Sequence, residues 1–126
     1  MGNVRLAALV VGLIVLSGVG DAQGFIHAST MWRDGRLQLR ELILSALGFA
    51  VGIGCYWVAV RYLSEAGIVS AELQTLLWFG VTLAGVALLG GEIASWRRID
   101  QLVALGVMLG IGWLLVGTGA NPSDGR

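Results

Sequence analysis

The sequence has little charge and few of the residue types that form disulfides or metal sites. Only 13% of its 126 residues are charged, all eight of its cations are arginines, and the formal net charge is zero. No basic cluster is long enough to indicate a nucleic-acid surface. The single cysteine, Cys55, cannot form an internal disulfide and has no second thiol for a metal site. We therefore expect no disulfide, no metal, no cofactor and no nucleic-acid partner.

Apolar residues dominate the composition. They make up 56% of the chain, and the mean hydropathy is +0.82. That leaves too little polar surface to cover a water-soluble globule, so the expected solvent is a lipid bilayer. A membrane-crossing helix needs about 20 mostly apolar residues. Four such windows occur, centred near Leu16, Gly52, Gly80 and Met108.

The predicted fold is all-α: an integral membrane bundle of four transmembrane helices that forms a single domain over residues 1–126. The helices are expected over about residues 6–30, 38–62, 68–92 and 100–119. The connecting segments are rich in charge, glycine or interfacial aromatic residues, as expected at headgroup level: "MWRDGRLQLRE", "RYLSEAG" and "SWRRID". No soluble domain fits, so any chemistry belongs to the helices or to a partner.

Asp21 follows the first apolar run without an intervening turn. If the first helix continues to Thr30, it has about 25 residues and Asp21 lies near mid-membrane. If it ends at Gly20, only about 15 apolar residues remain to cross the bilayer, which favours the longer helix. An ionised aspartate at a membrane centre costs about 2.5 to 3.5 kcal/mol and often serves function. Asp21 is therefore the principal candidate site residue.

Two further interpretations of the N-terminal region stay open. Arg5, the apolar run and the small residues at Gly20 and Ala22 are also compatible with a signal peptide cleaved before Gln23. The lone histidine, His27, lies nearer the helix end, where an interfacial hydrogen-bonding role is favoured over a proton relay.

Glycines at helix-packing spacing mark contact faces. In the last helix Gly106 and Gly110 form a GxxxG pair that Gly117 continues, and Gly48 and Gly52 repeat the spacing in the second helix. Such pairs let two backbones approach closely where lipid supplies no hydrophobic drive. Packing inside one bundle and dimerisation both fit the pattern. For the last helix, which needs only one internal neighbour, dimerisation is favoured.

Aromatic residues gather where the second and third helices could meet. Tyr56 and Trp57 lie in one, and Trp78 and Phe79 in the other. They could line a pocket for a flat, cationic or amphipathic ligand through cation–π and stacking contacts, although such rings more often form core or lipid-facing surface. Glu72 precedes Trp78 by about two turns and could approach the mouth of that pocket, although a pairing with charged groups at the membrane interface is favoured.

The overall layout resembles the small multidrug resistance family of the drug/metabolite transporter superfamily. The similar stretches are "YWVAVRYLSEAG", "LLWFGVTLAGVALLGGE" and "DQLVALGVMLGIGWLLVG". The resemblance implies an antiparallel dimer with a shared central cavity, in which a first-helix glutamate exchanges protons for substrate. This sequence has no glutamate there, and Asp21 lies about two residues from the expected acid, a rotation of about 200° around a helix.

The distribution of arginines predicts the orientation. Five arginines lie in the first and third loops (Arg33, Arg36, Arg40, Arg97 and Arg98) and three on the other side (Arg5, Arg61 and Arg126). The first and third loops are therefore expected to be cytoplasmic, with both termini outside, although an imbalance this small also fits dual insertion.

Two functions from different classes fit these features. The first is a dimeric, proton-coupled transporter of cationic or amphipathic solutes in the cell inner membrane, with Asp21 as the charged group and Tyr56, Glu72 and Trp78 shaping the cavity wall. The second is a non-catalytic transmembrane subunit or assembly factor that docks onto a larger membrane-protein partner. An enzyme is not expected, because no nucleophile, base and orienting group converge in the sequence.

Overall fold

The computed structural model describes residues 2–67 and 70–119. It confirms an all-α chain with four helices that are long and apolar enough to cross a membrane. These helices are α1 (Asn3–Ser29), α2 (Leu39–Glu65), α3 (Ala71–Gly90) and α4 (Arg98–Gly119). Two short strands, β1 (Trp32–Arg33) and β2 (Arg36–Leu37), join α1 to α2, and a 3-10 turn, η1 (Glu92–Ser95), precedes α4.

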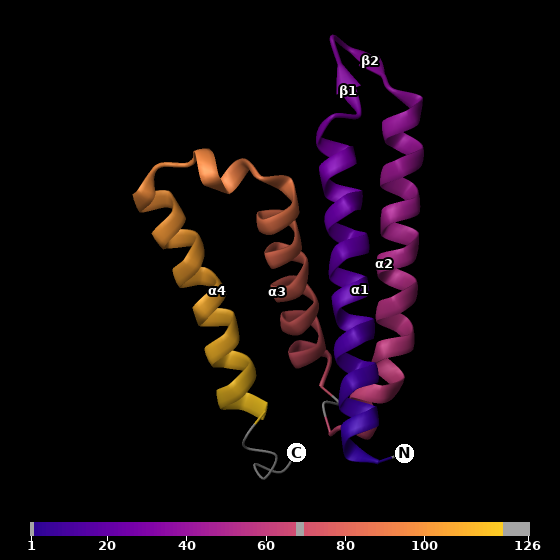
Figure 1. Cartoon of the computed structure of the whole chain (residues 1–126), viewed down its shortest axis with the longest axis vertical. Helices are drawn as coiled ribbons and strands as arrows, with labels where there is room; N and C mark the ends of the chain where they lie inside the picture. Colours follow the sequence, from indigo (N-terminus) through magenta and orange to yellow (C-terminus); the bar gives the residue numbers. More distant parts are fainter. Residues whose placement is uncertain (1, 68–69, 120–126) are drawn as a thin grey trace.

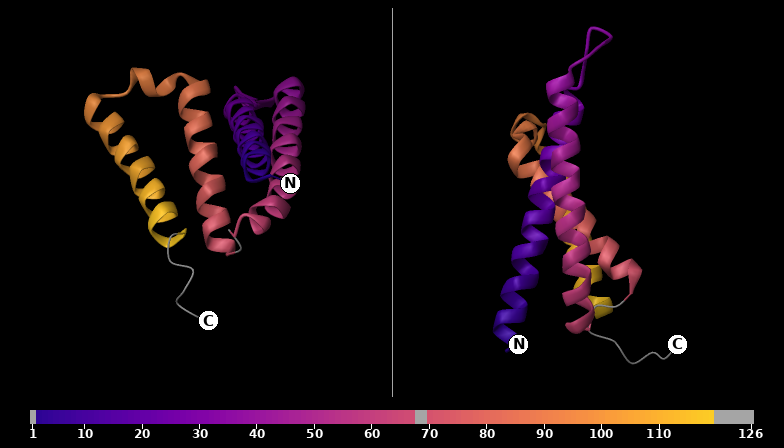
Figure 2. Two further views of the ribbon diagram at one scale, coloured as in Figure 1. Left: turned by 60° about the horizontal axis from the view of Figure 1, so that its bottom comes forward. Right: turned by 90° about the vertical axis from the view of Figure 1, so that its right-hand side faces the viewer.

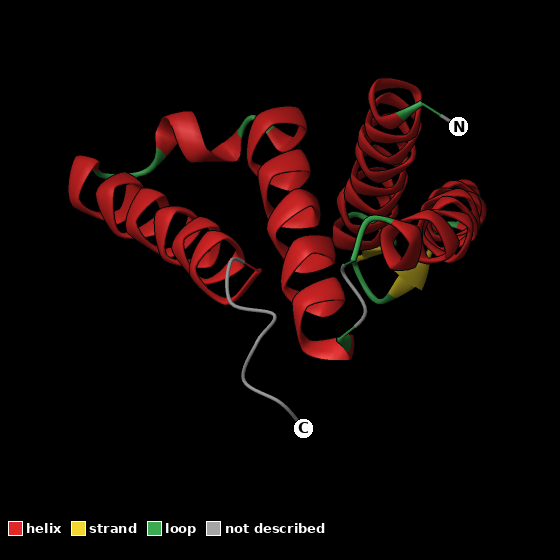
Figure 3. Cartoon of the chain, turned by 90° about the horizontal axis from the view of Figure 1, so that it is seen from below, coloured by secondary structure: helices red, strands yellow, loops and turns green. Residues whose placement is uncertain are grey.

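Successive helices alternate in direction, so α1 and α3 run parallel and α2 and α4 run opposite to them (Figure 1). The helix α1 packs along α2 on one side and against α3 on another. The last helix, α4, has α3 as its main neighbour. The two helices diverge, so that the distance between them is larger at the end that carries η1 (Figure 2; Figure 3). The helix α1 thus lies between α2 and α3, and α4 lies outside this packed group.

The first helix continues unbroken through Asp21. It ends at Ser29, with Thr30 as its C-cap. The alternative in which the helix ends at Gly20 is therefore wrong. The helix persists because glycine and alanine in this stretch let other helices pack directly against it, and this tertiary contact outweighs the low helix propensity of glycine.

A cluster of polar side chains joins the loop ends of α1 and α2. His27 Nδ1 lies 2.7 Å from Glu41 Oε2, and Thr30 Oγ1 donates to the same oxygen at 3.2 Å. Arg40 Nη1 donates to the other carboxylate oxygen, Glu41 Oε1, at 2.9 Å. This cluster closes the gap between the two helices just before the strands.

The connection between α1 and α2 is an ordered β-hairpin. Its turn residues, Asp34 and Gly35, have φ angles of 50° and 71°, which places both in the left-handed region. That conformation is typical of the tight turns for which Asp-Gly is favoured, because it matches the twist of the two strands. The predicted interfacial segment therefore folds into a defined structure.

Candidate functional site

Glycines bring the backbones of α1 and α2 into direct contact. A Cβ atom added at Gly20 would lie 2.7 Å from the backbone nitrogen of Gly52, and one added at Gly48 would lie 2.6 Å from that of Gly24. No side chain fits at such distances. Ser45 Oγ donates to the Gly24 carbonyl at 2.8 Å across the same seam. The Gly48–Gly52 pair singled out from the sequence thus faces a second GxxxG pair, Gly20–Gly24, which sequence reasoning missed although its spacing is the same.

A second close contact joins α1 to α3. A Cβ atom added at Gly85 would lie 2.8 Å from the Gly18 carbonyl oxygen and 3.0 Å from Ala22 Cβ. Gly18 in turn lies against Val81. The segment from Gly18 to Gly24 is therefore enclosed by α2 on one side and by α3 on another, and Asp21 sits in the middle of it.

Asp21 is completely buried at this junction, with an exposed fraction of 0%. Trp78 Nε1 of α3 donates to its Oδ2 at 2.6 Å. Gly52 of α2 lies directly against its carboxyl group, because a Cβ atom there would collide with Oδ1. Among the described residues no cation pairs with this carboxyl group. Residues of all three packed helices therefore meet at one uncompensated acid.

Three buried oxygens at this point lack a hydrogen bond. The hydroxyls of Ser17 and Thr82 lie beside the Asp21 carboxyl group. Neither hydroxyl, nor Asp21 Oδ1, has a hydrogen-bond partner of normal distance and angle among the described residues. Buried polar atoms in folded proteins are nearly always paired, so unpaired ones mark places where a proton, a water or a ligand completes the structure.

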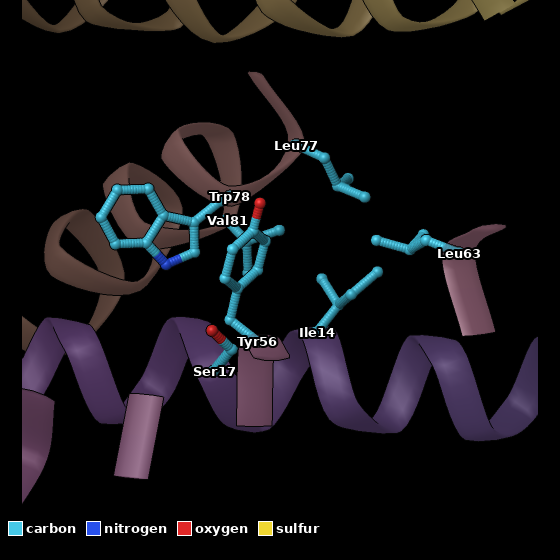
Figure 4. A pocket seen from close by; sticks show the side chains of 7 residues that line it. All are labelled: Ile14, Ser17, Tyr56, Leu63, Leu77, Trp78 and Val81. Atoms are coloured by element: carbon cyan, nitrogen blue, oxygen red, sulfur yellow. The ribbon is translucent and has the colours of Figure 1, made fainter. Parts of the chain in front are cut away.

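A small cavity lies beside Ser17 and Trp78, two of the residues that surround the acid (Figure 4). Its volume is ≈ 10 Å³, enough for about one water molecule. Figure 4 shows the indole nitrogen of Trp78 on the side that faces α1, with the ring of Tyr56 beside it. The two ring centroids are 5.9 Å apart, at an interplanar angle of 42°. The lining residues are Ile14, Ser17, Tyr56, Leu63, Leu77, Trp78 and Val81.

Three of the four predicted site residues lie together, and the fourth does not. Asp21, Trp78 and Tyr56 form a continuous group. Glu72 is exposed in the first turn of α3 and lines neither the cavity nor the acid. Trp57 is also directed outwards, with an exposed fraction of 72%. The described site is therefore an acid beneath two aromatic rings.

None of the residues that the structure describes packs against the predicted glycine seam of α4. Within residues 2–67 and 70–119, no atom lies within 4 Å of a Cβ atom added at Gly106, Gly110 or Gly117. The face that carries these glycines is therefore open to lipid or to another molecule.

A larger groove of ≈ 250 Å³ separates α3 from α4 below η1, and sequence reasoning did not foresee it. It is almost wholly apolar. Glu92 of η1 and Trp96, which directly follows η1, lie at one end of it. Its lining residues are Leu83, Val86, Ala87, Glu92, Ile93, Trp96, Ala104, Val107 and Met108.

Comparison with known proteins found no family model, no curated protein and no solved structure that matches the chain. The resemblance to the small multidrug resistance family therefore rests on the motifs quoted above. The chemistry of the site has to be inferred from its own residues.

The residues of the site favour the binding of a proton or a cation rather than the binding of a metal ion. The described residues contain no group of three or more His, Cys, Asp or Glu that could hold a metal ion. A buried carboxylate without a counterion is costly, so a proton or a cationic group is what would neutralise Asp21. The two aromatic rings beside it are surfaces on which a cationic ligand can rest.

Proposed function

We propose that this chain is a small membrane transporter of cationic or amphipathic solutes, coupled to protons through Asp21 and acting as a homodimer in the cell inner membrane. One observation carries the proposal. Asp21 is fully buried between three apolar helices. Among the described residues, only Trp78 gives it a hydrogen bond of normal geometry, and no cation forms an ion pair with it. An ionised carboxyl group inside a membrane costs free energy, so such groups commonly serve function. Exchange of a proton for a cation at Asp21 would be such a function.

In the proposed cycle Asp21 holds either a proton or the cationic solute. With a proton bound, the carboxyl group is neutral and the three helices can close around it. When the proton leaves, the carboxylate attracts a cation, and the faces of Trp78 and Tyr56 provide cation–π contact. Since the cavity beside Ser17 and Trp78 holds about one water, the solute can enter only after α3 has moved away from α1 at Trp78 and Val81.

The open glycine face of α4 supports the dimer in this proposal. No described residue of the same chain packs against Gly106, Gly110 or Gly117. GxxxG faces in membranes are typically covered by another helix. A dimer formed through α4 would leave α1 to α3 of each copy free to rearrange around its own acid.

Substitution of the acid tests the proposal. In proteoliposomes with an imposed pH gradient, the wild type should take up a quaternary ammonium probe faster than empty vesicles do. Asp21→Asn retains size and most hydrogen bonding but removes the titratable charge, so gradient-driven uptake should fall to the level of empty vesicles. Glu65→Gln is the matched control, because it removes an exposed acid at the end of α2 and should transport like the wild type.

The outcome is decisive when insertion and folding are verified for each variant by helical content and gel filtration. Uptake by Asp21→Asn equal to that of the wild type would reject proton coupling through this residue. A wild type that matches empty vesicles for a panel of cations would reject transport of this class.

A second function is favoured by a different observation. The closed packing around Asp21 and the open face of α4 also suit a non-catalytic transmembrane subunit or assembly factor, which docks onto a larger partner through its glycines. In that case Gly110→Leu should prevent assembly of the larger complex, whereas Asp21→Asn should leave it intact. Purification of the complex from native membranes distinguishes the two variants.

A further inference from the structure

The β-hairpin between α1 and α2 projects past the ends of the other helices (Figure 1; Figure 2). Both α1 and α2 have 27 residues. At about 1.5 Å per residue each is about 40 Å long, whereas the hydrocarbon layer is about 30 Å thick. The residues that join them therefore lie in the headgroup layer when the helices cross the membrane.

The hairpin has two chemically different faces. Trp32 pairs with Leu37, and Arg33 pairs with Arg36. Paired residues of antiparallel strands share a face, and neighbouring residues along a strand point to opposite faces. One face is thus apolar and the other carries two arginines. Trp32 and Leu37 have exposed fractions of 64% and 44%, so the chain itself does not cover the apolar face.

The two arginines lie directly opposite each other without a counterion. Like charges in this arrangement destabilise a pair of strands. Neither Arg33 nor Arg36 has an ion-pair partner among the described residues, although Asp34 lies in the adjoining turn. By contrast, Arg97 in the connection before α4 bonds Asp100 at 2.9 Å. The hairpin therefore presents an unneutralised pair of guanidinium groups, which is suited to an oxyanion.

We propose that this hairpin binds the phosphate group of an anionic phospholipid. Arg33 and Arg36 hold the phosphate between them, and the bound anion removes the repulsion across the strands. Trp32 and Leu37 rest on the apolar boundary below the headgroups, where tryptophan is preferred.

A lipid supplies both partners that the hairpin needs, an anion and an adjoining apolar layer. The arginine-rich side is also the side expected to face the cytoplasm, where anionic lipids give the membrane its negative surface potential. The proposal does not depend on transport.

Lipid binding by the purified full chain tests the proposal. In a neutral detergent, phosphatidylglycerol and phosphatidylcholine of equal chain length are titrated, and bound lipid is counted by native mass spectrometry. The wild type should prefer phosphatidylglycerol. Arg33→Gln/Arg36→Gln should lower that affinity roughly thirtyfold, since each of the two arginines that hold the phosphate contributes about a factor of five. Arg97→Gln/Arg98→Gln is the matched control, because it removes the same charge from the other loop on that side and should bind like the wild type.

Two further measurements separate the possible sources of the anion and test whether binding depends on charge. Inorganic phosphate at ten times the lipid concentration should not displace the lipid, because it offers nothing to Trp32 and Leu37; displacement would assign the site to a free anion and overturn the proposal. Wild-type binding should also weaken as salt is raised. Equal affinity for the two lipids, or equal loss in both double variants, would overturn it as well.

Discussion

The packed region formed by α1, α2 and α3 and the outer helix α4 use the same glycine spacing in opposite ways. In the packed region, Gly48 and Gly52 lie against the backbone of α1, and no side chain would fit there. In α4, no described residue lies within 4 Å of a Cβ atom added at Gly106 or Gly110, and none of the helix's described side chains is fully buried. The spacing alone therefore indicates that a helix can be approached closely. Whether the neighbour belongs to the same chain depends on the rest of the fold.

The largest effect is expected from a side chain placed in the seam between α1 and α2. Gly20→Leu should lower the free energy of unfolding by about 3 kcal/mol, because its Cβ atom would meet the backbone of Gly52 at 2.7 Å and the helices would have to separate. Unfolding in mixed detergent micelles, followed by circular dichroism, measures the change.

The control for this substitution is Gly112→Leu, at a position of α4 with nothing within 4 Å of an added Cβ atom. It should unfold like the wild type. If the two leucine variants were equally stable, the direct backbone contact between α1 and α2 would not exist in solution.

An intermediate effect is expected at the open face of α4. Gly106→Leu and Gly110→Leu should each abolish the dimer seen by crosslinking or gel filtration, while the monomer keeps its helical content, because leucine separates backbones that glycine lets approach. A glycine-to-leucine substitution would then destabilise the packed region, whereas in α4 it would only separate the two copies of the chain. An unchanged oligomeric state in both variants would reject dimerisation through this face.

The number and type of the helices could be predicted from the sequence because each has its own apolar window. Continuity through Asp21 could also be predicted, since a helix ending at Gly20 would have been too short to cross a bilayer. These predictions need only local information: length, hydropathy and the composition of the connecting segments. The β-hairpin had a local signal as well, the Asp-Gly pair at residues 34 and 35, but in that segment only charge and aromatic content were considered.

The partners of the acid could not be predicted, because they depend on how the helices are rotated. Trp78 is 57 residues from Asp21 in the chain, and its indole reaches the carboxyl group because Gly18 and Gly85 bring α1 and α3 together. Glu72 was expected near the same cavity on the basis of distance along the helix. Six residues turn a helix by about 600°, which leaves Glu72 about 240° around the axis from Trp78 and directed outwards.

The smallest effect is expected from the single hydrogen bond that the packed region gives to Asp21. Trp78→Phe keeps an aromatic ring beside Tyr56 but removes the donor that lies 2.6 Å from Asp21 Oδ2. The acid would then have no hydrogen-bond partner of normal geometry among the described residues, and the free energy of unfolding should fall by about 1 to 3 kcal/mol. Trp57→Phe, at an outward position of α2 with an exposed fraction of 72%, should change it by less than about 0.5 kcal/mol. Equal stability of the two variants would mean that Trp78 does not bond the acid. In the transport assay, Trp78→Phe should weaken binding of the quaternary ammonium probe less than Asp21→Asn does, since two aromatic rings remain and the charge of Asp21 is untouched.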